Sequence, residues 1–290
     1  MATQSKAQFL TDAYTLLRRR YKPKGEQDSA RLSVLKAVVY GICHEDTTRE
    51  NANQALSRFK DGYFDWNEVR VSDIDEIRES LAGIPDPEER AKRIRKFLRQ
   101  LFNRTYGFNL DALAKKPLKE ALKVLQTYEA FSSDYVTATV IQQALGGHAI
   151  PVDHETHRAL ERLGITEATI PELRAVLERA VPKNRGAEFL DLIEDLANDT
   201  CVEGEPDCAR CELRKMCPYA IARKEHEAAA RSAGKVRPSK EREKEIESPR
   251  PAPAQDGPST TASPKKSTPA RVAKEPPPAK PSPRSKQNPK

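Results

Sequence analysis

The stretch CVEGEPDCARCELRKMC, residues 201–217, holds four of the five cysteines of this 290-residue chain. Their spacing is Cys-x6-Cys-x2-Cys-x5-Cys, so all four thiols fall in one short segment. Thiolates grouped in this way suit zinc, Cu(I) or an iron–sulfur cluster. Disulfides need an oxidising compartment, and the polar start MATQSK precedes no apolar segment of a secretory signal. We therefore expect a metal centre whose ligands are Cys201, Cys208, Cys211 and Cys217.

The identity of the metal rests on the spacing within this segment. Zinc sites with four cysteines usually pair their ligands as two C-x2–4-C knuckles. Here only Cys208 and Cys211 have that form. The spacing therefore favours a [4Fe–4S] cluster, with structural zinc as the alternative.

A second motif lies upstream of the cysteines. The stretch LGGHAIPVD, residues 145–153, is followed by Arg158 and Arg162. This segment resembles the Val-Asp-x4-Arg-x3-Arg segment of the endonuclease III family of DNA glycosylases, in the helix-hairpin-helix superfamily, and the cysteine spacing resembles the family's C-terminal cluster loop. Residues 37–46 resemble its early helix and lesion-facing loop. The resemblance covers most of residues 5–222 in the family's order.

This resemblance implies a fold and an activity. Residues 30–146 would form a six-helix lobe with a degenerate helix-hairpin-helix, and residues 1–29 with 147–222 a helical lobe that carries the cluster. The implied activity is excision of a damaged or mismatched base from double-stranded DNA, with Asp153 as the catalytic carboxylate. The implied protein is a monomer that acts in the cytoplasm or nucleoid, or in a eukaryotic nucleus.

The hydrophobic pattern independently predicts an all-α fold. Apolar residues recur at helical spacing in several segments, for example at Leu10, Ala13 and Leu17. Asp73 is placed to cap a helix that Gly83 would end, and Pro117 is placed to begin another. No segment alternates like a strand, and no apolar run is long enough to cross a membrane.

The C-terminal residues differ from the rest in composition. Residues 223–290 contain 13 of the 22 prolines, with 17 basic and 8 acidic side chains, a net charge of +9. The whole chain carries +7, so the residues before 223 carry −2. Such a composition buries too little apolar surface to fold, and we expect a disordered tail. Its charge suits attraction to phosphates, and a solubilising extension is the equal alternative.

Asp153 is the residue on which a glycosylase hypothesis depends. Breaking an N-glycosidic bond develops positive charge on the sugar. A fixed carboxylate can stabilise this charge, or it can activate the water that attacks the sugar. Asp153 also has an ordinary explanation as the N-cap of a helix, with Thr156 three residues later. Both roles are compatible. The helix N-terminus should lower the pKa of Asp153 and keep it ionised.

Tyr135 bears on whether the enzyme could also cut the DNA backbone. The resemblance places Tyr135 where bifunctional members of the family carry the lysine that forms a Schiff base. No lysine lies between Lys123 and Lys183 to replace it. We therefore expect a monofunctional glycosylase without lyase activity, with Tyr135 lining the base pocket. The alternative is a tyrosine that only packs its ring in a helix.

The hairpin that should bind DNA departs from the family's pattern. The family's Leu-Pro-Gly-Val-Gly turn corresponds here to residues 129–134, EAFSSD, which lacks both glycines. Asp134 adds a negative charge where a phosphate would lie, while Ser132 and Ser133 can cap the next helix. Candidate DNA contacts are therefore Ser132, Ser133 and Arg158. These departures favour a second hypothesis, a catalytically silent relative that binds DNA or protein and keeps the cluster as a structural element.

Two further sets of residues have simple expected roles. Cys43 stands where relatives carry a glutamine that fills the gap left by the flipped nucleotide, and we expect a buried thiol instead. His44 and Glu45 are expected in a solvated loop, or else inserted into the duplex. The histidines around Asp153 are expected at the surface or facing phosphate: His148, His154 and His157.

Deleting residues 223–290 should weaken DNA binding and flatten its dependence on salt concentration, because this segment supplies the net positive charge. The measurement is the dissociation constant for a DNA duplex over a range of salt concentrations, for the full and shortened chains. An unchanged salt slope would show that the tail makes no phosphate contacts.

Overall fold

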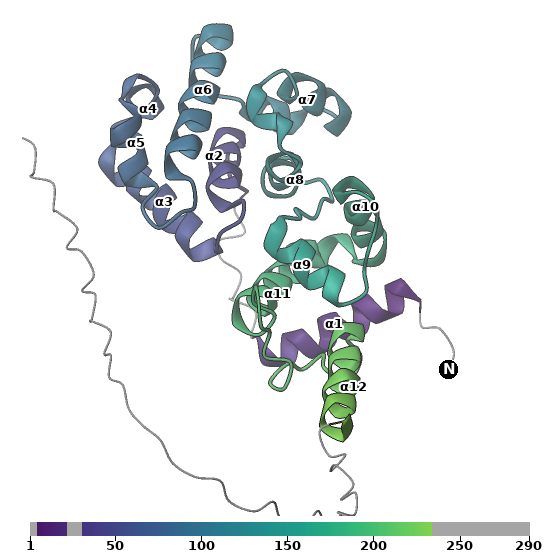
Figure 1. Ribbon diagram of the computed structural model, residues 1–290. Helices are drawn as coiled ribbons and strands as arrows, with labels where there is room; N and C mark the ends of the chain where they lie inside the picture. The colour runs from purple at the N-terminus through teal and green to yellow at the C-terminus, as the bar shows by residue number, and fades with distance from the viewer. Residues whose placement is uncertain (1–4, 22–30, 234–290) are drawn as a thin grey trace, which may run out of the picture. The chain divides into compact units, whose positions relative to one another are not determined.

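The computed structural model describes residues 5–21 and 31–233, and all regular structure in these ranges is helical (Figure 1). The predicted all-α fold is confirmed. The tail beyond residue 233 lies outside the described residues. Residues 223–233, which we assigned to a disordered tail, are instead part of helix α12. No helix in the described ranges has the length and apolar character that a membrane crossing requires.

The first hydrophobic core is built by the helices between residues 34 and 143. Its buried side chains include Val38, Ile77 and Phe97, all 1 % exposed or less. The elements that contribute to this region are α2 (Val34–His44), α3 (Arg49–Gly62), α4 (Trp66–Val71), α5 (Ile74–Ser80), α6 (Pro87–Thr105), η1 (Asp111–Lys115), α7 (Leu118–Leu125), η2 (Glu129–Ser132) and α8 (Asp134–Gln143).

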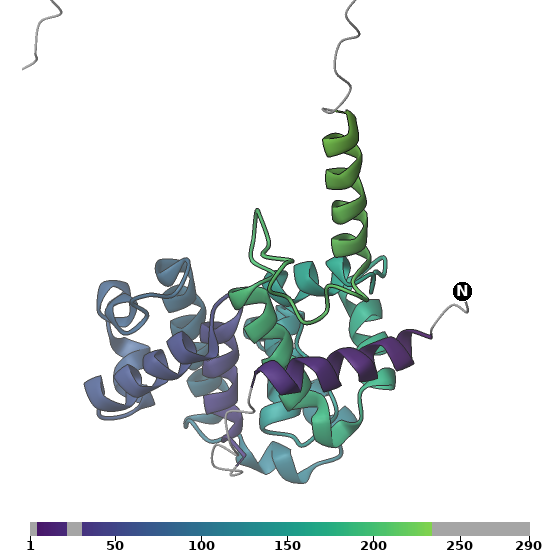
Figure 2. The ribbon, with the colours of Figure 1, turned by 90° about the horizontal axis from the view of Figure 1, so that it is seen from below.

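A second core joins the start of the described chain to its end. Leu10 and Leu17 pack with Phe189 and Leu213 although they are far apart in sequence. Figure 2 shows α1 lying across α11, and α1 also packs against α10. The elements of this region are α1 (Lys6–Arg20), α9 (His154–Arg162), α10 (Ile170–Ala180), η3 (Lys183–Arg185), α11 (Gly186–Asp199) and α12 (Pro218–Ala233).

The helix boundaries follow signals that are visible in the sequence. Asp73 caps α5 in a capping box with Glu76, as predicted, and Gly83 follows the helix with φ of 84°. Pro117 is the N-cap of α7 rather than its first residue, one position from the prediction. These local features set where each helix begins and ends. The site depends on how two of these helices, α2 and α8, pack together.

Gly41 allows α2 and α8 to approach closely. A Cβ atom at this position would lie 3.3 Å from the Cα of Val136 and 3.4 Å from the Cβ of Thr139. Both neighbours belong to α8, and one of them is backbone, which has little room to move. The close approach matters because α2 ends at His44 and α8 carries Tyr135 in its first turn.

Gly41→Ala should destabilise the protein by about 1 kcal/mol, because overpacking costs about 1–3 kcal/mol and exceeds the ~1 kcal/mol of helix propensity that alanine adds. Urea unfolding followed by circular dichroism measures the change. The matched control is Gly62→Ala at the end of α3, where a Cβ meets no atom within 4 Å. If both variants have the same midpoint as the parent, the close packing at Gly41 is not a constraint.

Candidate functional site

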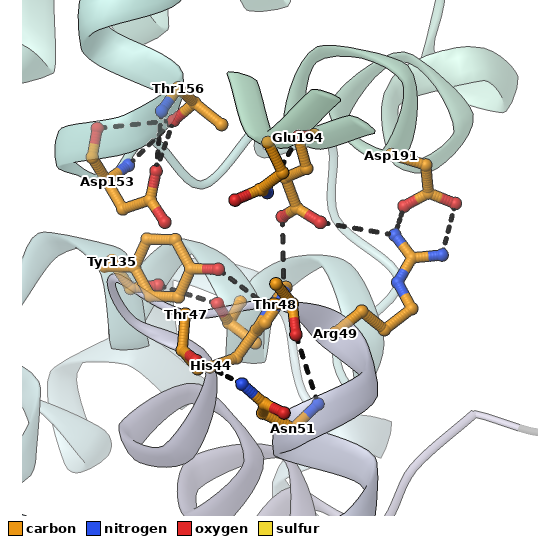
Figure 3. Close-up of polar contacts among 12 residues, drawn as sticks. His44, Thr47, Thr48, Arg49, Asn51, Tyr135, Asp153, Thr156, Asp191 and Glu194 are labelled. Atoms are coloured by element: carbon orange, nitrogen blue, oxygen red, sulfur yellow. Dashed lines mark hydrogen bonds and ion pairs between the residues drawn. The ribbon is translucent and has the colours of Figure 1, made fainter. Parts of the chain in front are cut away.

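The predicted catalytic residues lie where the two cores adjoin. Asp153 is the N-cap of α9, and Tyr135 projects from the first turn of α8. Both are buried, at 7 % and 3 % exposure. Figure 3 shows the carboxylate of Asp153 directed toward the ring of Tyr135. Charge on Asp153 is among the causes that raise the pKa of Tyr135, after burial.

Asp153 is held by a complete capping box. Its Oδ1 accepts hydrogen bonds from the Thr156 backbone N–H at 2.9 Å and from the Thr156 hydroxyl at 2.7 Å. The Thr156 hydroxyl also accepts from the Asp153 N–H at 3.0 Å. These bonds fix the carboxylate through one oxygen. The predicted N-cap is therefore present, and it holds the side chain in a single orientation.

The pKa of Asp153 is shifted in the direction opposite to our expectation. We predicted that the helix N-terminus would lower its pKa. Burial instead raises the pKa of Asp153 above its ordinary value of 3.8, and the Thr156 hydrogen bonds only partly oppose this. The negative charges of Glu194 and Asp46 raise it further. The prediction was wrong because desolvation of a buried carboxylate outweighs the stabilisation from a helix end.

Tyr135 is joined to two residues that the sequence analysis did not select. Its hydroxyl lies 2.8 Å from Nδ1 of His44, and Nε2 of His44 lies 3.5 Å from Oε1 of Glu194 (Figure 3). The carboxylate favours a proton on Nε2, so Nδ1 is left to accept from the tyrosine hydroxyl. Burial raises the pKa of Tyr135 well above 10, so the phenol stays neutral.

A partly buried ion-pair network continues from Glu194. Arg49 Nη2 lies 3.7 Å from Glu194 Oε2, and the same guanidinium pairs with Asp191 (Figure 3). Arg49 is the first residue of α3, whereas Glu194 and Asp191 belong to α11. The network therefore connects elements of the first core to a helix of the second.

The early loop reaches α9 as well. Asp46 has φ of 54°, a left-handed conformation that aspartate tolerates better than most residues. Its Oδ1 accepts a hydrogen bond from the His154 N–H at 2.9 Å. The loop after α2 is therefore anchored beside Asp153, at the start of the same helix.

The sequence contained weak signals for the missed residues. Glu194 lies at helical spacing with Leu190 and Ala197, so it falls on the apolar face of α11. His44 follows Tyr40 by four residues on the buried side of α2. An ionisable residue on an apolar face is a candidate for a buried polar contact. Our expectation of a solvated loop at His44 was wrong, since this side chain is 3 % exposed. Cys43 is buried, as expected.

The altered hairpin is occupied by contacts within the protein. Ser133 caps α8 by accepting from the Val136 N–H at 3.2 Å, and its hydroxyl donates to Glu45 at 2.6 Å. Ser132 is exposed. Asp134 lies 3.7 Å from the guanidinium of Arg174, which offsets the charge that would repel a phosphate. Of the predicted DNA contacts in this hairpin, Ser132 is therefore the accessible one.

Arg158 lies inside the protein rather than on its surface. It is 9 % exposed, and its Nη2 donates to the carbonyls of Ala197 and Cys201, each at 3.1 Å. Its Nη1 pairs with the carboxylate of Glu155. This arrangement does not suit the phosphate contact that we predicted, because the guanidinium holds the end of α11. Arg158 therefore does not join Ser132 and Ser133 in one DNA-binding surface.

The three predicted surface histidines differ in exposure. His154 is exposed, whereas His148 and His157 are partly buried. His148 Nε2 lies 2.8 Å from the Glu178 carbonyl and 2.9 Å from the Val181 carbonyl, at the end of α10. Its ring therefore caps a helix instead of facing solvent.

The four cysteines of residues 201–217 share one small cavity of about 20 Å³. Apolar side chains such as Leu163, Leu196 and Ala220 also line it, and of the four cysteines Cys217 is buried while the others are partly exposed. Arg162 Nη1 lies 3.7 Å from the Cys201 sulfur, where a cation can offset thiolate charge. Burial raises the pKa of the thiols in this cavity at Cys208, Cys211 and Cys217.

The metal centre at these four cysteines stays a prediction. Within the described residues, no group of three or more histidine, cysteine, aspartate or glutamate side chains is arranged to hold one metal ion. The predicted [4Fe–4S] cluster would be held by the thiols that line this cavity, those of Cys201, Cys208, Cys211 and Cys217.

No model of a protein family matches the chain, and no curated protein matches it in sequence. Solved structures do match. A trapped covalent intermediate of endonuclease III with DNA has a TM-score of 0.60 at 16 % identity, covering 76 % of this chain and 100 % of that one. The chain has the endonuclease III-like DNA glycosylase fold.

Two other solved structures share this fold. A thermostable thymine-DNA glycosylase matches with a TM-score of 0.53 at 19 % identity, over 74 % of this chain and 95 % of that one. The 3-methyladenine DNA glycosylase of H. pylori, bound to 1,N6-ethenoadenine, matches with 0.52 at 14 % identity, over 69 % and 100 %. The predicted resemblance to the endonuclease III-like fold is therefore confirmed.

Cys208→Ser should abolish metal binding and loosen residues 201–217, because thiolate ligation and local folding are coupled. Anaerobically purified parent protein should contain about four irons per chain, the content of one [4Fe–4S] cluster. Iron and zinc analysis with absorption spectroscopy measures both. Cys43→Ala, which removes a buried thiol outside the cavity, should keep the iron. Stoichiometric zinc without iron would contradict the cluster assignment.

Proposed function

We propose that this protein is a DNA N-glycosylase of base-excision repair, which removes a damaged or mismatched base by hydrolysis. The observation that carries the proposal is the placement of Asp153. Its buried carboxylate is fixed by a capping box at the junction of the two cores. Solved proteins of this fold include glycosylases bound to DNA or to a modified base.

Asp153 would act on the sugar. Thr156 engages Oδ1 of the carboxylate, and among the described residues no hydrogen bond is recorded at Oδ2. The free oxygen can stabilise positive charge on the sugar or orient the attacking water. Both functions need the ionised form. Since burial raises the pKa of Asp153, activity should fall with decreasing pH earlier than for an ordinary carboxyl group.

Tyr135 supports a monofunctional reaction. Lyase chemistry needs an amine that attacks the sugar, and Tyr135 offers a buried neutral phenol. His44 holds this phenol, and Glu194 in turn faces His44. We assign His44 and Glu194 as positioning residues, because they act on the pocket through Tyr135. The predicted product is free base and an intact abasic strand.

The substrate is proposed to be double-stranded DNA bound by a monomer. Asp153 is too buried to meet a base that stays stacked, so the nucleotide must be flipped out of the duplex. The [4Fe–4S] cluster is proposed as a structural group. Arg158 and Arg162 connect the cysteine segment to the helix that begins at Asp153.

A catalytically silent relative is the second candidate. It is favoured by the hairpin, where Ser133 is committed to α8 and Glu45, and by the burial of Arg158. Fewer free donors remain for phosphates than the family resemblance implies. This candidate predicts DNA or protein binding without base release.

A panel of duplexes, each with one damaged or mismatched base, tests the two candidates. The glycosylase should release free base from at least one duplex, with strand breaks only after alkali. Borohydride should trap no covalent adduct, because Tyr135 replaces the amine nucleophile. An adduct with the parent protein would contradict the monofunctional assignment. DNA binding with no base release across the panel would favour the silent relative.

Asp153→Asn should slow base release by about 100-fold or more, the usual contribution of a positioned acid or base. It should keep the iron and most DNA affinity, since the lost charge acts mainly in the transition state. Single-turnover rates from pH 4 to 8 measure the effect, roughly spanning the titration of a carboxyl group with a raised pKa. Glu161→Gln, an exposed carboxylate on the same helix, is the control and should leave the rate unchanged. An active Asp153→Asn protein would remove Asp153 from the mechanism.

A further inference from the structure

An apolar groove lies away from the candidate site. It has a volume of about 620 Å³ and is lined by Leu32, the first turn of α2, α3, the α3–α4 turn and α4. Phe59 and Val69 form its buried floor, at 3 % and 1 % exposure. Tyr63 and Trp66 are partly buried walls that pack against the first core. The groove is therefore a preformed part of a rigid region.

Phe64 stands at the rim of this groove, 96 % exposed. Its backbone is nevertheless fixed. The Phe64 N–H donates to Glu68 Oε2 at 2.6 Å, and Asp65 caps α4 by accepting from the Glu68 N–H at 2.9 Å. An exposed aromatic ring on a fixed backbone gains contact area on binding and loses little conformational freedom. Such residues typically contribute most of the affinity at protein interfaces.

The free charge beside the groove is positive. Lys36 and Lys60 both line it, and neither forms an ion pair with any residue that the structure describes. The lining also holds one carboxylate, Asp65, which caps α4, so the lining carries two positive charges and one negative charge. A ligand for this groove should therefore carry apolar side chains flanked by acidic ones.

We propose that the groove between α2, α3 and α4 is a docking site for an acidic amphipathic helix of a partner protein. Its walls are helices, so the groove can receive the apolar face of another helix, with the acidic positions toward Lys36 and Lys60. Duplex DNA fits less well, because nucleic-acid affinity needs many phosphate contacts and this lining is mainly apolar. The chain's own residues 223–290 carry +9 and are repelled by the same lysines.

The groove is placed so that docking leaves the candidate site open. Lys36 lies near the first turn of α2, and His44 is its last residue. Eight residues of α-helix separate them, roughly 12 Å at 1.5 Å per residue. The groove lining includes neither Tyr135 nor Asp153, so the proposed docking residues are separate from those of the candidate site. This proposal does not depend on the glycosylase activity.

Trp66 makes the proposal directly measurable, because it is the only tryptophan in the chain. The probes are 18-residue synthetic peptides without tryptophan, with Leu and Phe at positions i, i+3, i+4 and i+7 and Glu elsewhere. Titration into the full chain should shift the Trp66 emission, and affinity should fall with salt. Peptides with Lys in place of Glu, a scrambled acidic peptide and oligothymidine are the comparison ligands.

Two sets of variants test the lining. Phe64→Ala should raise the dissociation constant about tenfold or more, a typical effect for an interface anchor. The double variant Lys36→Glu with Lys60→Glu should bind the acidic peptide more weakly, and this binding should depend less on salt concentration. The matched controls are Tyr106→Ala, another highly exposed aromatic ring, and Lys119→Glu, an exposed lysine on α7. Neither control should change the titration.

Three outcomes would overturn the proposal. The first is the absence of an emission shift with every acidic peptide of the panel. The second is equal binding of the basic and scrambled peptides, which would indicate nonspecific association. The third is tighter binding of oligothymidine with loss on Lys36→Glu, which would make the groove a nucleic-acid site. An emission shift that depends on protein concentration alone would instead mark contact between copies of this chain.

Discussion

The buried carboxylate of Glu194 is the charge on which the arrangement of the site depends. A carboxylate in the interior costs several kcal/mol unless opposite charges and hydrogen-bond donors surround it. Here His44 faces one oxygen and Arg49 the other. Both partners come from the first core, whereas Glu194 belongs to a helix of the second. This one carboxylate therefore links α2 and α3 to α11 through contacts of 3.5 and 3.7 Å, which are ion-pair rather than hydrogen-bond distances.

Local features of the site were readable from the sequence. The capping box at Asp153 depends on residues three positions apart, so its pattern is visible in the chain. The four cysteines of one short segment likewise share one cavity. The helices followed from apolar spacing and caps. Each of these features is set by neighbours in sequence, which is why a single sequence can indicate them.

Long-range polar contacts were not readable. His44 and Tyr135 are 91 positions apart in the sequence, and Glu194 lies even farther along the chain from His44. The sign of the Asp153 pKa shift was missed for the same reason, because the burial that raises it comes from packing of distant segments. Arg158 matched a motif, but the motif did not indicate that its guanidinium would bind carbonyls of α11 and the cysteine segment.

Helix α9 gives the two candidate sites a common mechanical support. Its N-cap is Asp153, and two turns later Arg162 donates to the carbonyls of Val202 and Gly204. A nine-residue helix is too short and too well packed to bend appreciably between these points. The position of the Asp153 carboxylate and the path of the cysteine segment are thus both set by helix α9. A substitution that displaces one end of α9 should therefore also displace the other, so the carboxylate and the cysteine segment are not structurally independent.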